Sequence, residues 1–185
     1  MKQQIEAALT PLLGLPLRDC WRPNIEGFQS LQRFEFGAQR PATNRQGKHL
    51  TFGEYALHVG CAWRIIGQGR ILAAYIDLYY PADNPNESGD HDDFDSYQPG
   101  ASQRDRQVQH FVERLDASPL FVERIEADEV GSVTMSLGRG YKLEILPMDS
   151  LPFEFWRLLR VRQRNKTEEH FVVTGRGIEA KIDEE

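Results

Sequence analysis

The chain has 185 residues, of which 40% are hydrophobic and 10% aromatic, and its formal net charge is −6. These are ordinary values for a globular chain that buries its own core, so we expect a single domain over residues 1–185. No apolar run approaches the roughly 18 residues of a membrane span. Met1–Ala8 also lacks the apolar stretch of a secretory signal. We therefore expect a cytoplasmic protein without a membrane partner.

The acidity of the chain is concentrated in one segment. No Lys or Arg occurs between Leu78 and Gln103, and the rest of the chain carries 22 acidic and 22 basic residues. The six acids of this segment are Asp83, Glu87, Asp90, Asp92, Asp93 and Asp95. Because the remaining charge is balanced and the local excess is negative, we expect no nucleic-acid partner.

The first part of the chain predicts one helix and one strand. Apolar residues repeat at helical spacing within Lys2–Leu13, although Pro11 is unfavourable in the last turn of such a helix. An irregular segment with two prolines follows. Gly27–Phe36 has the apolar content of a strand, and the polar segment Gly37–Lys48 predicts a loop.

The clearest predicted element is a β-hairpin. Glu54–Ile66 alternates apolar and polar residues over its whole length, which is typical of a strand with one buried face. Gly67–Gly69 then supplies a turn, and Arg70–Tyr80 supplies a second apolar strand. The face that we expect to be buried contains Tyr55, Leu57, Val59, Cys61, Trp63 and Ile65.

A loop and a helix follow the hairpin. Residues 81–101 hold the acidic segment together with several prolines and glycines, so we expect a loop that is mobile over much of its length. Ser102 is suited to cap a helix, and Asp105 three residues later completes a capping box. An apolar stripe at i, i+3, i+4 and i+7 then predicts an amphipathic helix that ends before Pro119.

The last third of the chain predicts sequential strands. They are Leu120–Ala127, Gly131–Leu137, Tyr141–Ile145, Phe153–Val161 and His170–Thr174, followed by a charged tail over 179–185 that we expect to fray. Sequential strands usually pair with their neighbours. The prediction is therefore an α+β fold with a mainly antiparallel, meander-like sheet and two helices, one N-terminal and one central.

The acidic segment is the first candidate site. Its six carboxylates form an acidic surface that suits a basic protein partner and needs no special geometry. Two alternatives stay open. Asp90, Asp92, Asp93 and Asp95 could supply oxygen ligands to a hard cation, although the spacing of a calcium loop is absent. The segment could instead be a solvated loop without a binding role.

A pocket formed by His58, Arg64 and Asp77 is the second candidate site. Alternation places His58 and Arg64 on one face of their strand, and Asp77 belongs to the predicted partner strand. A histidine near a carboxylate can act as a general base. No nucleophile or oxyanion motif accompanies the set, however, and Cys61 lies on the opposite face. A structural role for His58 is the simpler interpretation.

The sequence assigns no catalytic residue, metal ligand or cofactor. The two cysteines, Cys20 and Cys61, match no metal or redox spacing. Cys61 lies within the alternating strand pattern, so we interpret it as a small buried apolar residue.

Several strand segments carry a resemblance to known sequences. Tyr55–Arg64, Leu143–Pro147 and Glu154–Arg157, together with His170–Val173, resemble a group of small uncharacterised bacterial proteins. Some members of that group are similar to immunity proteins of contact-dependent toxin systems. The resemblance consists of strand-core patterns. It implies a bacterial, cytosolic, β-rich domain and carries over no catalytic residue.

Two hypotheses for the function follow. The favoured one is a non-enzymatic protein-binding module, of the immunity or adaptor type, that takes a basic partner on its acidic surface. The alternative is a small-ligand-binding protein or enzyme with a pocket on the His58 face. Neither hypothesis predicts an oligomeric state.

Overall fold

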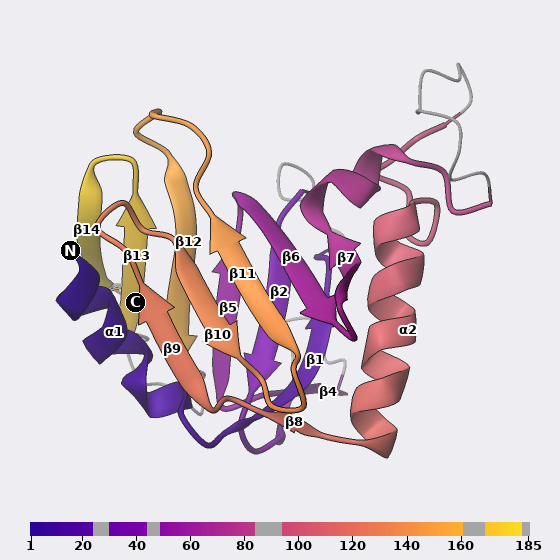
Figure 1. The fold of residues 1–185 in the computed structure, drawn as a ribbon, viewed down its shortest axis with the longest axis horizontal. Helices are drawn as coiled ribbons and strands as arrows, with labels where there is room; N and C mark the ends of the chain where they lie inside the picture. The colour runs from indigo at the N-terminus through magenta and orange to yellow at the C-terminus, as the bar shows by residue number, and fades with distance from the viewer. Residues whose placement is uncertain (24–29, 44–48, 84–93, 161–168, 183–185) are drawn as a thin grey trace.

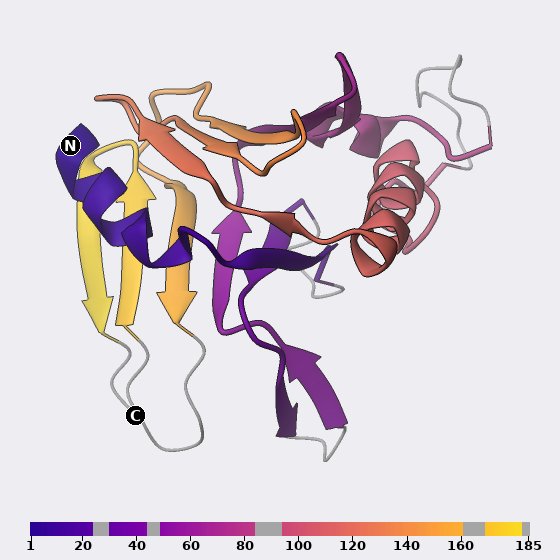
Figure 2. The same ribbon diagram turned by 60° about the horizontal axis from the view of Figure 1, so that its bottom comes forward.

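The computed structural model describes residues 1–23, 30–43, 49–83, 94–160 and 169–182 (Figure 1). Within them, two large antiparallel sheets form two facing layers. Helices α1 (Lys2–Leu9) and α2 (Gln103–Ala117) lie at opposite ends of these layers (Figure 2). The predicted α+β class, the antiparallel pairing and the two helices are confirmed.

The first layer is a seven-stranded sheet with the strand order β14-β13-β12-β5-β2-β1-β8. Its strands are β1 (Pro16–Trp21), β2 (Gln32–Phe36), β5 (Tyr55–Val59), β8 (Leu120–Phe121), β12 (Glu154–Arg160), β13 (Glu169–Thr174) and β14 (Gly177–Ile182). The consecutive strands β12, β13 and β14 form a meander. The pairing of β12 with β5 joins segments that are far apart in the sequence.

The second layer is a five-stranded sheet with the order β7-β6-β11-β10-β9. Its strands are β6 (Ala62–Gly67), β7 (Arg70–Ala74), β9 (Arg124–Ala127), β10 (Val133–Ser136) and β11 (Lys142–Leu146). A separate hairpin is formed by β3 (Arg40–Thr43) and β4 (His49–Phe52). Two 3₁₀ helices, η1 (Thr10–Leu12) and η2 (Tyr75–Tyr79), complete the described elements.

The two layers pack through their apolar faces. Phe34 of β2 meets Trp63 of β6 edge to face, with ring centroids 5.4 Å apart, and both side chains are buried. Trp156 of β12 donates its indole N–H to the carbonyl oxygen of Gly131, at 2.8 Å, next to β10. The predicted alternating face of the hairpin is thus buried because it lies against the opposite sheet.

The long strand predicted over Glu54–Ile66 is two strands in different sheets. β5 ends at Val59 and β6 begins at Ala62. Between them, the N–H groups of Gly60 and Cys61 donate to the carbonyl oxygen of Phe155 at 2.8 and 3.1 Å. The sequence alternates without interruption because both strands turn their apolar residues toward the shared core. Leu120–Ala127 is divided in the same way into β8 and β9.

The central helix is confirmed. Its cap is Ser102, whose hydroxyl oxygen accepts a hydrogen bond from the backbone N–H of Asp105 at 3.2 Å. Three residues of the predicted stripe are buried, namely Val108, Phe111 and Leu115. The β6–β7 turn is also confirmed. Gln68 and Gly69 both adopt positive φ angles, of 54° and 74°, as a two-residue hairpin turn requires.

Other segments differ from the sequence-based expectations. The predicted N-terminal helix ends at Leu9 and continues as η1, because Pro11 has no N–H for an α-helical bond. η2 replaces the end of the predicted strand Arg70–Tyr80.

Three strands occupy segments that were predicted to be irregular, loop or frayed. β1, β3 and β14 are held by their partners β2, β4 and β13, which the local sequence does not reveal. The strand β14 covers the predicted tail as far as Ile182, and residues 183–185 lie outside the described ranges. Within the described residues, neither α1 nor α2 qualifies as a membrane-spanning helix.

Candidate functional site

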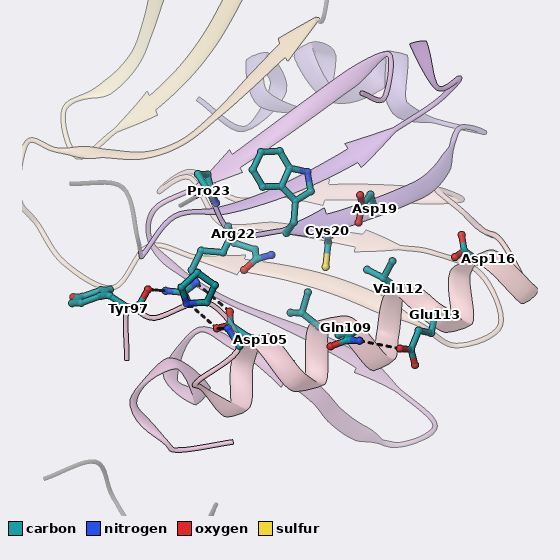
Figure 3. A pocket seen from close by; sticks show the side chains of 15 residues that line it. Asp19, Cys20, Arg22, Pro23, Tyr97, Asp105, Gln109, Val112, Glu113 and Asp116 are labelled. Carbon is teal, nitrogen blue, oxygen red and sulfur yellow. Dashed lines mark hydrogen bonds and ion pairs between the residues drawn. The ribbon is translucent and has the colours of Figure 1, made fainter. Parts of the chain in front are cut away.

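A cavity of about 440 Å³ lies between β1 and α2 (Figure 3). One wall is Asp19–Pro23, and the other is the face of α2 from Asp105 to Asp116. Gln32 and the residues Tyr97 to Gly100 contribute to the rest of the lining. We call this cavity the β1–α2 groove. Its volume is in the range of sites for small ligands or for single side chains of a partner.

The groove exists because one edge of β1, the edge opposite β2, is only partly paired with a strand. β8 pairs with β1 only at Pro16 and Leu17, so among the described elements it is α2, rather than a strand, that packs along the rest of this edge. Successive residues of β1 then point in different directions. Cys20 and Val112 point into the groove from its two walls (Figure 3).

An ion pair closes one end of the groove. Arg22 donates to Asp105 through two hydrogen bonds, from Nη2 to Oδ2 at 2.6 Å and from Nε to Oδ1 at 3.1 Å. The two side chains are 7% and 16% exposed. Arg22 also donates to the carbonyl oxygens of residues 96, 97 and 98 at 3.1–3.3 Å. This arginine therefore attaches the end of the acidic segment to β1.

Three carboxylates lie toward the other end of the groove. They belong to Asp19 on β1 and to Glu113 and Asp116 on α2, and Figure 3 shows Asp19 and Asp116 away from the Arg22–Asp105 pair. Glu113 accepts a hydrogen bond from Gln109 at 3.2 Å. Within the described residues, no Lys or Arg forms an ion pair with any of the three. This end of the groove thus carries carboxylates without an ion-pair partner among the described residues, although the charge of Arg33 acts on Asp19.

The carboxyl group of Asp19 holds its proton more tightly than usual. Burial raises the pKa of Asp19, and the neighbouring carboxylates of Glu35 and Asp116 raise it further. A cation in the groove would oppose this effect, because it would favour the ionised form.

A buried polar group without a partner lies beside the groove. Gln32 is 1% exposed, and its amide nitrogen Nε2 has no hydrogen-bond partner within the described residues. Beside it, Cys20 is buried, and burial raises the pKa of its thiol. The thiol is therefore protonated at neutral pH. An unsatisfied buried donor is uncommon, because its burial costs the free energy of desolvation and no hydrogen bond offsets that cost.

His58 lies in another part of the molecule, on the outer face of the seven-stranded sheet. Burial lowers the pKa of His58 to about 3, with contributions from the charges of Arg33 and Arg157. Nη1 of Arg33 is 3.0 Å from Nε2 of His58. Because a guanidinium can only donate, Nε2 accepts this bond and the ring proton is on Nδ1. The lone pair that a general base would use is therefore occupied.

The other two residues of the predicted His58 pocket have partners of their own. Arg64 of β6 lies in the five-stranded sheet and pairs with Glu144 of β11 at 2.6 Å. Asp77 lies in η2 and accepts a hydrogen bond from the backbone N–H of Ala74 at 2.8 Å. The structure thus places His58 and Arg64 in different sheets, because the chain changes sheets between β5 and β6, and it places Asp77 in a 3₁₀ helix.

Around His58, the outer face of the sheet holds a row of charged and polar side chains that are hydrogen-bonded to one another or to neighbouring acids. Trp21, Arg33, His58 and Arg157 are cross-strand neighbours on β1, β2, β5 and β12. Glu35 accepts hydrogen bonds from the side chains of Trp21 and Arg33, at 3.0 and 2.8 Å, and from a backbone N–H at 2.7 Å. Such a satisfied network supports a structural role for this face.

Of the six acids in the acidic segment, two are described. Asp83 and Asp95 are exposed, and Asp95 accepts a hydrogen bond from the backbone N–H of Tyr97 at 2.9 Å. Glu87, Asp90, Asp92 and Asp93 lie outside the described residues. The described residues contain no group of three or more His, Cys, Asp or Glu side chains that could hold a metal ion.

The groove residues were not singled out by the sequence analysis. Asp19 and Gln32 belong to strands whose pairing places them opposite α2, and the sequence carries no local signal of that placement. Glu113 and Asp116 lie outside the apolar stripe of the helix, and their sequence positions are those of ordinary solvent-exposed acids. No protein-family model, curated protein or solved structure matches the chain.

Proposed function

We propose that the protein is a non-enzymatic binding module, of the immunity or adaptor type, that takes a basic group of a protein partner in the β1–α2 groove. The observation that carries this proposal is the set of three groove carboxylates, Asp19, Glu113 and Asp116, which have no basic partner within the described residues. A positively charged side chain is the complement of such a site.

The position of the acidic segment supports the same proposal. Arg22 attaches the end of this segment to the rim of the groove, and Asp83 and Asp95 are exposed. Clustered charge of one sign raises the rate at which oppositely charged partners arrive. In the proposal, the segment attracts a basic partner and the groove holds one of its side chains.

The protonation states of the described groups favour binding over catalysis. Burial keeps the thiol of Cys20 protonated and raises the pKa of Cys61 to about 12, so neither is a ready nucleophile. His58 is neutral and its Nε2 is engaged by Arg33. The alternative function, a ligand or enzymatic pocket on the His58 face, therefore has less support.

A basic peptide tests the proposal. Fluorescence anisotropy of a labelled peptide of alternating glycine and arginine would measure its affinity for the native protein and for two variants. The first variant, Glu113→Gln/Asp116→Gln, removes two exposed groove charges. The second, Glu123→Gln/Glu126→Gln, removes two exposed charges elsewhere and is the control.

The groove variant is expected to bind about three- to tenfold more weakly than the native protein, because each carboxylate contributes a modest ion pair. The control variant should stay close to the native affinity, and all binding should weaken as salt rises. Equal losses in the two variants would show that only net charge matters and would remove the groove from the proposal.

A further inference from the structure

We infer that a second pocket, on the opposite side of α2 from the β1–α2 groove, binds a phosphate group. This pocket has a volume of about 140 Å³. It is lined by Arg70–Leu72 at the start of β7 and by Gln107, His110, Phe111 and Arg114 of α2. We call it the β7–α2 pocket. The inference concerns a different site from the proposed function and does not depend on it.

The two sites lie on opposite sides of one helix. α2 packs against β1 of the first sheet and against β7 of the second (Figure 1). Gln107, His110 and Arg114 are at positions i, i+3 and i+7, which share one side of an α-helix. Asp105 and Asp116 of the groove lie about half a turn around the helix axis from them. α2 therefore presents acids to the groove and basic side chains to the β7–α2 pocket.

Every polar side chain of the β7–α2 pocket can donate hydrogen bonds. Arg70 and Arg114 carry guanidinium N–H groups, Gln107 carries an amide NH₂, and the ring of His110 has at least one N–H in either protonation state. None of the described residues that line the pocket is acidic. Within the described residues, neither arginine forms an ion pair. The complement of this pocket is therefore an anion with acceptor oxygens.

The origin of the two arginines favours phosphate over a carboxylate. Arg70 belongs to a strand and Arg114 to a helix, so the chain brings two separate guanidinium groups to one small pocket. A single guanidinium can engage both oxygens of a carboxylate through two parallel hydrogen bonds. A phosphate ester has three acceptor oxygens and about −1.5 to −2 charge at neutral pH, so it can accept from both arginines at once.

NMR titration of the ¹⁵N-labelled full chain tests the inference. The probes are inorganic phosphate, phenyl phosphate and acetate, each added at pH 7 and constant ionic strength. We expect phosphate to give saturable shifts in Arg70–Leu72 and in Gln107, His110 and Arg114. The Kd should be on the order of 1 mM, because both arginines are exposed and such ion pairs are weak. Acetate should bind at least about threefold more weakly, since one arginine can occupy both of its oxygens.

Arg70→Gln and Arg114→Gln are the test variants. The control is Arg176→Gln, which removes an exposed arginine from the turn between β13 and β14. Each test variant should weaken phosphate binding about three- to tenfold, and the control should keep the native affinity. Three results would each overturn the inference: no saturable shift at the pocket, equal losses in all three variants, or acetate binding as tight as that of phosphate.

Phenyl phosphate distinguishes a phosphate ester from the free ion. Ile71 lines the pocket and is 53% exposed, so it offers an apolar contact to the organic part of an ester. Phenyl phosphate that binds at least as tightly as inorganic phosphate would support a phosphate carried by a larger molecule. Weaker binding of phenyl phosphate would support a site for the free ion. Either order is consistent with a phosphate site, provided that both test variants weaken it.

Discussion

Arg22 and Asp105 lie 83 positions apart in the sequence and are joined by two hydrogen bonds of 2.6 and 3.1 Å. Because Arg22 also donates to three backbone carbonyls of the acidic segment, one side chain links the end of β1, that segment and the start of α2. The pair defines one end of the groove. The stability of the fold and the shape of the site therefore depend on the same contact.

Asp105→Ala is expected to lower the free energy of unfolding by about 2–4 kcal/mol. The substitution removes the carboxylate from a guanidinium that is 7% exposed, and it removes an acid from the first turn of α2. Urea unfolding followed by circular dichroism measures the loss. Glu126→Ala, which breaks the exposed pair with Arg124, is the control and should cost about 0.5 kcal/mol or less. A loss no greater than that of the control would contradict the structural role of the pair.

Gln32→Leu is expected to stabilise the protein. The substitution removes a buried donor that has no partner within the described residues, and such a donor costs about 1–3 kcal/mol. Thermal unfolding should therefore show a higher Tm than the native protein. A lower Tm would contradict the cost that we assign to this unpaired donor.

Asp19→Asn is expected to have opposite effects on stability and on binding. Since the folded state raises the pKa of Asp19 above its ordinary 3.8, the folded chain keeps this proton to a higher pH than the unfolded chain. Ionisation of Asp19 thus costs stability as pH rises from about 3.8 through the raised pKa, and the cost persists at neutral pH. The variant should be more stable than the native protein at pH 7, with a gain that disappears in acid, and should bind the basic peptide less tightly at pH 7.

Denaturation curves and peptide anisotropy at neutral and acidic pH check both effects of Asp19→Asn. A variant that is less stable at neutral pH would contradict the assigned cause of the shift. A variant with native affinity at pH 7 would remove Asp19 from the binding site.

The sequence predicts the elements that depend on contacts between residues close together in the chain, and it does not predict those that depend on distant segments. α2 follows from a local cap at Ser102 and a local stripe, and the β6–β7 hairpin follows from alternation around a two-residue turn. β1 was not predicted, because its proline and charged residues are uncommon in strands. The segment is extended because it pairs with β2. The break at Gly60 was not predicted either, since alternation cannot show that two strands belong to different sheets.

The groove could not be predicted from the sequence for the same reason. Its lining comes from β1, β2 and α2, and only the strand order and the packing of α2 against β1 bring these elements together. The acidic segment could be recognised because its six acids lie close together in the sequence. The predicted pocket of His58, Arg64 and Asp77 assumed one continuous hairpin, and the change of sheet after β5 places His58 in a different sheet from Arg64.

His58 is expected to stay neutral far into the acidic range. Burial and the charges of Arg33 and Arg157 lower its pKa to about 3, from an ordinary value of 6.5. Between these two values the unfolded chain binds a proton that the folded chain does not bind. The free energy of unfolding therefore falls as pH drops through this window. The ring signals of His58 in NMR spectra should not move between about pH 7.5 and 4.5, a range bracketing the ordinary histidine pKa.

His58→Gln provides the comparison for this prediction. The variant should lose less stability than the native protein on acidification from about pH 7 to 4, because it lacks the linked proton. A His58 ring that titrates near its ordinary pKa would contradict the engagement of its Nε2 by Arg33, and it would restore this face as a candidate for acid–base chemistry.

The most direct measurement of the central claim is the location of a bound basic peptide on the protein. Backbone and side-chain NMR signals would be followed as the glycine–arginine peptide is added to the ¹⁵N-labelled chain. Binding in the β1–α2 groove should give saturable shifts at Asp19, Gln32 and Val112 and along the exposed face of α2 around Asp116, with His58 and Arg64 unaffected. Shifts that spread evenly over the acidic residues, or that centre on the His58 face, would contradict it.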